Sequence, residues 1–511
     1  MLFEKVIASR WSGANQLRRI KTGPNFPGQT LLATDTPKHC LLTVIVFNKL
    51  YKLLQAFLFQ LEDRNGTYMV LCRNVPHNLR ASGDRTRSVS SVSHTRPCYN
   101  LASVTTSSTK PESPRDSAKA PPAGASQPGS VPILDLQRQY EQVRAEVLAA
   151  VGRVCASQQY ILGPEVEALE RELAEFCGAQ DAVGCASGTD ALWLALVAAG
   201  VRAGDQVLTT PFSFFASAGA IVRAGARPVF ADIEPDSFNL DPEKVLTFLR
   251  GGQRDNIRAL LAVHLYGQCA DMNSLPKVAD EFHLALIEDA AQAIGARRGE
   301  RKAGSMGVSA AFSFYPTKNL SAYGDAGLVT TNDTDSAAQM RRLRNHGSPR
   351  RYVHEEFGWN SRLDAIQAAI LRVKLKYVAG WNEGRRERAA RYDQLFTEAG
   401  LNSTGDQAEN SAPISLPQTS ADTYHVFHQY VVRAFRRDEL REFLSARKIG
   451  TEIYYPIPLH LQPCFIYLGY QEGDFPEAER AAKEVLALPM FPELTDEEQQ
   501  WVVKSIADFY C

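Results

Sequence analysis

Short apolar runs alternate with helical patterns along the chain from Val131 onwards. Each run ends in small or polar residues, as the buried strands of a sheet do. Apolar residues with helical spacing lie between several runs, for example over 189–199 and 216–224. The runs occupy residues 181–186, 206–210, 227–232, 257–264, 284–288 and 309–314. This alternation predicts an α/β fold with a mostly parallel central sheet covered by helices on both faces.

The same pattern divides the chain into parts. Towards the C-terminus it becomes one long helical stretch over 364–388 and then a mixed region. We therefore expect a large domain over 131–375 and a smaller C-terminal α+β domain over 376–511. Residues 1–130 show no sustained periodicity, and their last part, 103–130, is rich in Ser, Thr, Pro, Ala and Gly. This composition predicts a poorly structured leader and linker.

The leader raises the questions of membrane insertion and targeting. Its apolar stretch, 41–61, is interrupted by two lysines, an asparagine and a glutamine, so we predict no spanning helix and leave an amphipathic segment open. Residues 1–130 carry 17 Lys and Arg against 7 Asp and Glu, whereas 131–511 carry 39 against 50. Such a basic leader is typical of an organelle-targeting peptide and also fits a misassigned gene start. We expect the rest of the chain in the cytoplasm.

Composition argues against some classes of function. Hydrophobic residues make up 44% and charged residues 22%, as in soluble globular proteins, and no basic patch with interleaved aromatics indicates a nucleic-acid partner. The nine cysteines are scattered and never spaced as C-x-x-C. Neither a disulfide framework nor a zinc site is expected, and we predict no metal. Cys185 is interpreted as a small buried apolar residue.

Three segments follow predicted strands, at the edge where open α/β sheets bind ligands. The first is SGTD at 187–190. Gly188 would allow a ligand to approach the backbone, and Thr189 with the free N–H groups of a helix start could hold a phosphate. A turn that merely caps the helix is the alternative.

The second segment, IEDAAQ at 287–292, closes a buried strand with acids. Burying an acid is costly unless it is paired. A cationic pyridinium nitrogen beside Asp289 would offset that cost, and the acid would keep a cofactor ring protonated. Capping of the next helix by Asp289 is the alternative.

The third segment, FSFYPTKNL at 312–320, places Lys318 just after a strand and before the turn YGD at 323–325. A lysine there could form a Schiff base with an aldehyde cofactor if burial or a neighbouring cation lowers its pKa. Ser313 could donate to the same phosphate. Taken alone, Lys318 also fits a surface lysine.

The order and spacing of these segments, with PFSF at 211–214, resemble the DegT/DnrJ/EryC1/StrS sugar aminotransferases. These are enzymes of the aspartate aminotransferase fold type that depend on pyridoxal 5'-phosphate. The resemblance covers essentially all of 131–511 and none of the leader. It also rests on VPILDL (131–136), YILGPE (160–165), GTDAL (188–192), GARPVF (225–230), VHLYGQ (263–268), YPIPLH (455–460) and LPM (488–490).

The resemblance implies roles for residues around the cofactor ring. Lys318 matches the lysine that bonds to the cofactor aldehyde and later shuttles a proton. Asp289 matches the acid paired with the pyridinium nitrogen. Gln292 matches a residue near the phenolic oxygen, and Phe214 matches the aromatic that stacks on the ring.

The resemblance also implies how the phosphate is held. Gly188, Thr189 and Ser313 match phosphate-binding positions. Asn360, in GWNSRLD at 358–364, matches an asparagine that reaches the phosphate of the neighbouring subunit's cofactor. A site shared in this way implies a homodimer.

The implied reaction moves an amino group from a donor, L-glutamate, to a keto-sugar carried on a nucleotide, in amino-sugar and polysaccharide biosynthesis. Lys318 would be the base in the first half and the acid in the second. The segment at 360–364 looks more like members that aminate C3, because members that aminate C4 more often have Tyr and Met at the positions of Ser361 and Leu363.

The remaining candidates concern the sugar pocket and the type of function. Tyr323, His346 and His460 could line that pocket, although both histidines also fit structural roles. A keto-cyclitol aminotransferase and a non-catalytic regulator or sensor on the same fold stay open. A dehydratase is disfavoured because position 318 is Lys and the cysteines do not cluster. A regulator would not need a Schiff-base lysine.

Overall fold

The computed structural model describes residues 129–252, 256–402 and 412–511, and the backbone of short strands before them. Those strands form two antiparallel pairs, β1 (Leu17–Lys21) with β2 (Thr30–Thr34) and β3 (Leu61–Glu62) with β4 (Tyr68–Met69). The predicted linker and nearly all of the apolar stretch 41–61 lie outside the described residues. The compact unit from Ser117 to Cys511 contains all the other described residues.

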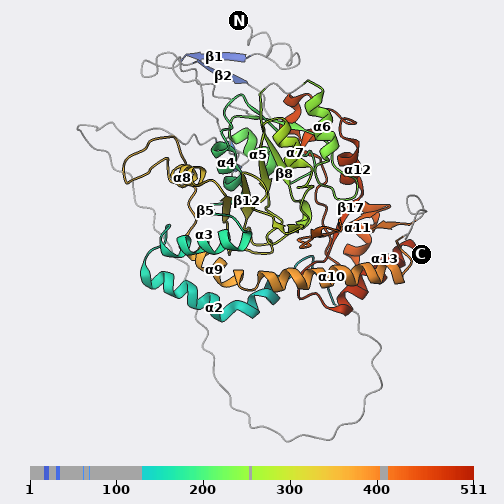
Figure 1. Cartoon of the computed structure of the whole chain (residues 1–511). Helices are drawn as coiled ribbons and strands as arrows, with labels where there is room; N and C mark the ends of the chain where they lie inside the picture. Colours follow the sequence, from blue (N-terminus) through green and yellow to red (C-terminus); the bar gives the residue numbers. More distant parts are fainter. Residues whose placement is uncertain are drawn as a thin grey trace, which may run out of the picture. The chain divides into compact units, whose positions relative to one another are not determined.

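A sheet in the order β5-β13-β12-β9-β8-β6-β7 forms the centre of this unit (Figure 1). Only β13 within it is antiparallel to its neighbours, β12 and β5. The strands are β5 (Asp181–Cys185), β6 (Gln206–Thr209), β7 (Arg227–Phe230), β8 (Ile257–Val263), β9 (Ala285–Asp289), β12 (Ser309–Ser313) and β13 (Gly327–Thr331). The six predicted strands are confirmed, and β13 was not predicted.

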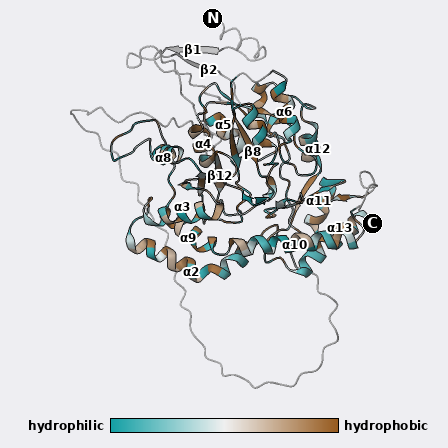
Figure 2. Ribbon diagram, in the orientation of Figure 1, coloured by the Kyte–Doolittle hydropathy of each residue, from teal (hydrophilic) through white to brown (hydrophobic). Residues whose placement is uncertain are grey.

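Helices cover both faces of the sheet. Successive strand residues point to opposite sides, and here both sets are apolar, so each face needs a covering layer. In β8, Ala259 and Leu261 face one core, and Leu260 and Ala262 face the other. One face carries α4 (Gly188–Ala198), α5 (Ala216–Arg223) and α8 (Thr334–Leu343); the other carries α3 (Pro164–Cys177), α6 (Pro242–Arg250) and α7 (Leu275–Glu281). Figure 2 shows apolar residues gathered on the central strands. The predicted α/β class is confirmed.

The predicted helix over 364–388 is wrong as one continuous element. The structure has α9 (Ala365–Leu375) and α10 (Val378–Glu398). The N–H of Tyr377 donates to the carbonyl of Lys374 at 3.0 Å, a tighter turn that ends α9. Because α9 packs on α3 and on α2 (Leu136–Ser157), whereas α10 packs on α13 (Asp496–Tyr510), the break lets each helix bury its own apolar side.

The C-terminal part has its own antiparallel sheet, in the order β14-β16-β17. Its elements are β14 (Ile414–Ser415), β16 (Tyr430–Ala434), β17 (Val485–Leu488), α11 (Arg437–Ala446) and α12 (Pro476–Glu484). A further small sheet joins β10 (Arg297–Arg298), β11 (Arg301–Lys302) and β15 (Thr423–Tyr424). The boundary expected near residue 376 stays a prediction.

No helix in the described part is both long enough and apolar enough to cross a bilayer.

Candidate active site

The predicted cofactor residues follow strands that run in one direction, so they meet at one edge of the sheet. Gly188 and Thr189 follow β5, Phe214 follows β6, Asp289 ends β9, and Ser313 ends β12. Lys318 lies in the loop after β12. The structure therefore brings together at this edge the residues predicted to surround the ring and the phosphate.

The first turn of α4 is shaped to receive an anion. The Ser187 hydroxyl caps the helix by accepting the N–H of Asp190 at 3.1 Å. Among the described residues, the N–H groups of Gly188 and Thr189 have no acceptor. A Cβ on Gly188 would lie 2.6 Å from the Cβ of Ser313, so only glycine lets the turn lie this close to β12. Free N–H groups and the helix dipole favour a phosphate here.

Two consecutive acids end β9 and point to opposite faces. Glu288 is fully satisfied by His264 Nε2 at 2.9 Å and by the backbone N–H groups of Gly304, Met306 and Gly307. Among the residues that the structure describes, Asp289 accepts only from the Ser217 hydroxyl at 2.8 Å and from the N–H of Ala291 at 3.2 Å.

The incomplete hydrogen bonding of Asp289 leaves it room for one more donor. Burial raises the pKa of Asp289, although the Ser217 hydrogen bond partly opposes the rise. A protonated ring nitrogen would supply both the missing donor and the missing positive charge. Helix capping, the alternative for Asp289, is not seen, because no α-helix follows β9 directly.

Lys318 has an amine that is easy to deprotonate. Burial lowers the pKa of Lys318 to about 8, and the nearby Asp289 carboxylate opposes the shift. A lowered pKa makes part of the amine population uncharged near neutral pH, as attack on an aldehyde requires.

The loop that carries Lys318 is anchored by the next residue. Asn319 is buried, and its amide donates to Asn382 at 2.8 Å and to the carbonyl of Val426 at 3.2 Å. Its oxygen lies 3.1 Å from His428 Nδ1. Burial, reinforced by the charge of Lys318, holds the pKa of His428 well below its usual range, so this contact is made by a neutral imidazole.

Gln292 has a defined amide orientation. Its oxygen accepts the N–H of Tyr266 at 2.7 Å, and its nitrogen donates to the Tyr455 hydroxyl at 3.1 Å. One amide hydrogen therefore remains for a ligand oxygen. The ring of Tyr455 lies 6.0 Å from the ring of Phe214, which is 56% exposed and free to cover a planar ligand.

Sequence reasoning missed two residues of this site. Ser217 lies in the first turn of α5 and donates to Asp289, but an isolated serine in a helix gives no sequence signal. Tyr455 supports Gln292 and belongs to the YPIPLH motif, which was the available sequence signal. Burial raises the pKa of Tyr455, so its hydroxyl stays protonated.

The remaining predicted residues lie in different surroundings, and their roles stay predictions. Tyr323 is partly exposed, and its backbone is tied to Gln367 at 2.8 Å. His346 is exposed. His460 is 1% exposed, and its Nε2 lies 3.1 Å from Glu479, which also accepts backbone N–H groups. The contact with Glu479 fits a structural histidine, whereas Nδ1 of His460 is buried and has no hydrogen-bond partner among the described residues.

Asn360 is exposed and makes no hydrogen bond to the other predicted site residues among those described. Its segment is held against residues 343–346, through Trp359 N–H to Leu343 at 2.7 Å and a backbone bridge to Asn345. Asn360 is thus displayed on the surface of its own subunit.

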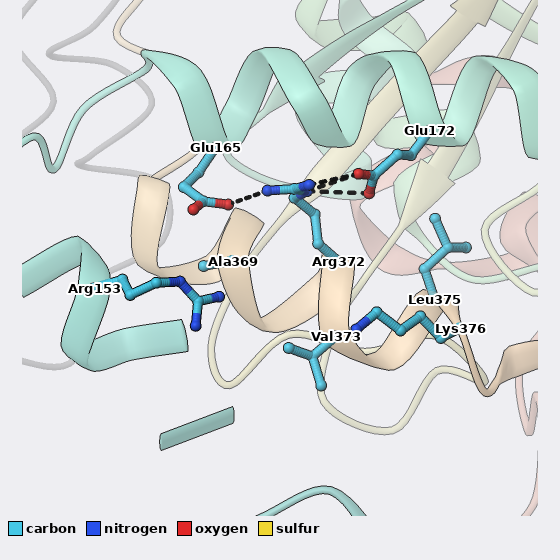
Figure 3. Close-up of a pocket in the computed structure, with 8 residues that line it drawn as sticks. All are labelled: Arg153, Glu165, Glu172, Ala369, Arg372, Val373, Leu375 and Lys376. Carbon is cyan, nitrogen blue, oxygen red and sulfur yellow. Dashed lines mark hydrogen bonds and ion pairs between the residues drawn. The ribbon is translucent and has the colours of Figure 1, made fainter. Parts of the chain in front are cut away.

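A separate pocket of about 310 Å³ lies between α2, α3 and α9 (Figure 3). Arg372 binds Glu165 and Glu172 there, each at an N···O distance of 2.6 Å. The pocket is lined by Arg153, Glu165, Glu172, Ala369, Arg372, Val373, Leu375 and Lys376. None of these belongs to the predicted site, and the central charge is already compensated.

The chain matches the DegT/DnrJ/EryC1/StrS aminotransferase family over residues 141–507. It is 50% identical to a pleiotropic regulatory protein of Geobacillus stearothermophilus, over 75% of this chain and 99% of that protein. It is 44% identical to the dTDP-3-amino-3,4,6-trideoxy-alpha-D-glucose transaminase of Streptomyces venezuelae, over 74% and 96% of the two chains. The crystal structure of S. venezuelae DesV in complex with a ketimine intermediate is similar, with a TM-score of 0.70 and 44% identity over 75% and 99% of the two chains. The chain therefore belongs to the DegT/DnrJ/EryC1/StrS family and is an aminotransferase.

Proposed function

We propose that this aminotransferase moves an amino group from L-glutamate to a nucleotide-linked keto-sugar and aminates C3. The main observation behind the proposal is that Lys318, whose pKa is lowered by burial, lies near a buried acid, Asp289. The preference for C3 is supported by the 44% identical relative, whose name describes a 3-amino sugar on dTDP. Ser361 and Leu363 give it no further support, because both side chains are buried.

The residues at the sheet edge fit pyridoxal 5'-phosphate part by part. The turn at Gly188 and Thr189, with Ser313, would hold the phosphate, and Asp289 would pair with the ring nitrogen. Gln292 would donate its remaining hydrogen to the phenolic oxygen. When bound, the cofactor supplies the aldehyde that receives the amino group and the ring that stabilises negative charge.

Lys318 would be the residue that carries protons during the reaction. Its amine would bind the cofactor at rest, then remove a proton from the donor amino acid and return one to the sugar. The hydrogen bonds of its neighbour Asn319 would hold the backbone that carries this amine in place. Phe214 and Tyr455 would cover the ring and exclude water.

A homodimer is part of the proposal. Tyr352 is 81% exposed and Phe357 101% exposed, on the same segment as Asn360. Exposed aromatics this close together favour burial against a partner. A second copy would cover them and bring Asn360 to the partner's phosphate site.

Isotope-labelled L-glutamate tests the proposal directly. The full-length chain is incubated with L-glutamate labelled at its amino nitrogen and with dTDP-sugars that carry a ketone at C3 or at C4. NMR then locates the labelled nitrogen in the sugar product. We expect 2-oxoglutarate and label at C3. Label at C4 alone would overturn the preference for C3, and no transfer to either sugar would exclude both dTDP-sugars as acceptors. A keto-cyclitol in the same assay tests that alternative.

A regulatory role is the second candidate, because the 50% identical relative is named a regulatory protein. This chain keeps Lys318, Asp289, Gln292 and Ser313, which a purely regulatory protein would not need. Lys318→Ala separates the two roles. A regulatory phenotype that survives this substitution would be independent of catalysis.

A further inference from the structure

The first turn of α4 contains an acid as well as the candidate phosphate site. Asp190 follows Gly188 by two residues, and its side chain is 14% exposed. An acid at a helix N-terminus interacts with the same positive end of the dipole that attracts a phosphate. A poorly exposed carboxylate is also weakly screened by salt. An unpaired Asp190 would therefore oppose phosphate binding.

Arg223, in the last turn of α5, neutralises this acid. Its guanidinium is hydrogen-bonded to the Asp190 carboxylate, and Asp190 is its ion-pair partner within the described part of the chain. The same guanidinium lies 4.9 Å from the ring of Trp193 and 5.5 Å from that of Trp359. Contact with two indole rings fixes the cation, because tryptophan faces attract arginine.

The cluster of Asp190, Trp193, Arg223 and Trp359 joins three elements that meet at the phosphate turn. Asp190 and Trp193 lie three residues apart on α4, so both side chains point to the same side of the helix. The two indole rings meet edge to face, with centroids 6.0 Å apart. Trp359 also precedes Asn360. This arrangement holds Arg223 over Asp190 while leaving the N–H groups of Gly188 and Thr189 free.

We propose that Arg223 is a positioning residue for the cofactor phosphate, which it favours by cancelling the charge of Asp190 at the start of α4. The proposal rests on the proposed cofactor site. It predicts that substituting Arg223 weakens the binding of a ligand that carries the phosphate group. This loss of affinity should disappear when Asp190 also loses its charge. A residue that only stabilised the fold would affect all ligands of the site alike.

The test is a binding titration on the full-length chain after removal of its cofactor. Dissociation constants are measured for pyridoxal 5'-phosphate and for pyridoxal, which lacks the phosphate. Arg223→Gln should weaken pyridoxal phosphate binding about tenfold, as expected for one uncompensated charge near an anion. Pyridoxal binding should stay within about twofold, because the predicted repulsion acts only on the phosphate.

Two further variants isolate the charge. Arg223→Lys keeps the cation and should bind pyridoxal phosphate within about threefold of the wild type. The double variant Asp190→Asn/Arg223→Gln should recover most of the lost affinity, because the repelling charge is gone. Melting temperatures report whether each variant folds. If Arg223→Gln fails to fold, the double variant and Arg223→Lys still decide the question.

Arg250→Gln is the matched control, because it removes the same charge from an exposed pair with Glu281 at 3.2 Å. It should leave both affinities unchanged. Equal losses for pyridoxal and pyridoxal phosphate in Arg223→Gln, or no recovery in the double variant, would overturn the proposal. If the wild type binds neither compound, the proposed cofactor site fails instead.

Discussion

Residue chemistry at the end of β9 depends on how each buried charge is compensated. Within the described part of the chain, Glu288 has four hydrogen-bond donors, whereas Asp289 has two donors and a raised pKa. Sequence alone could not separate two adjacent acids, because their faces depend on the register of the strand. Burial lowers the pKa of Lys318, and the charge of the nearby Asp289 carboxylate raises it. Together they leave the pKa of Lys318 at about 8.

The rate of cofactor attachment should follow the titration of Lys318. A pKa lowered to about 8 means that the reactive, uncharged amine is the minor form at pH 7 and the major form above pH 8. Stopped-flow absorbance of cofactor-free protein mixed with pyridoxal phosphate should show a rate that rises through this range. Asp289→Asn should move the midpoint to lower pH, because the carboxylate raises the pKa of Lys318. A midpoint near the ordinary lysine pKa would contradict the burial of this amine.

Asp289→Asn and Glu288→Gln should have opposite consequences. The first removes the partner of the ring nitrogen and should lower kcat by at least about 100-fold with little change in melting temperature. The second breaks a buried pair with His264 and should cost about 3 kcal/mol of unfolding free energy while the cofactor still binds. Steady-state kinetics and chemical denaturation measure both. Equal activity losses would show that the two acids are not functionally distinct.

At the scale of elements, the apolar runs predicted the parallel strands well because a buried strand needs a continuous apolar sequence. The break between α9 and α10 could not be predicted, since no Pro or Gly marks residues 375–378 and the turn reflects different packing partners. Most of the predicted cofactor residues follow strands, and their positions after apolar runs were visible in the sequence. Ser217 and Tyr455 were not assigned, because their roles depend on contacts between distant segments.

The contact between α4 and β12 allows a direct test of the phosphate turn. Gly188→Ala would place a Cβ 2.6 Å from that of Ser313 and should cost about 1–3 kcal/mol of stability and weaken cofactor binding. Adding Ser313→Gly should restore stability, whereas Ser313→Ala, which keeps the Cβ, should not. Denaturant titration of the three variants measures this. Full stability in Gly188→Ala would mean that the turn does not lie against β12.

On the scale of the whole molecule, two hydrogen bonds tie Val131, near the start of the first long described stretch, to the C-terminal part of the chain. The N–H of Val131 donates to Lys448 at 3.0 Å, and Gly450 donates back to Val131 at 2.8 Å. The 50% identical relative is matched over 99% of its length by 75% of this chain. A chain that starts at Ser130 should therefore fold, dimerise and turn yellow with cofactor, as sedimentation and absorbance would show. An insoluble or colourless product would assign residues 1–129 a part in folding or in the site.

The central claim, that Lys318 holds the cofactor and carries protons, is tested most directly by an absorbance spectrum taken before and after L-glutamate, beside that of Lys318→Ala. The wild type should show a visible band that glutamate bleaches, because the amino group passes to the cofactor. Lys318→Ala should bind the cofactor without turning over. If the wild type shows no visible band with added cofactor, or if Lys318→Ala is bleached by glutamate at the same rate, Lys318 does not perform this chemistry.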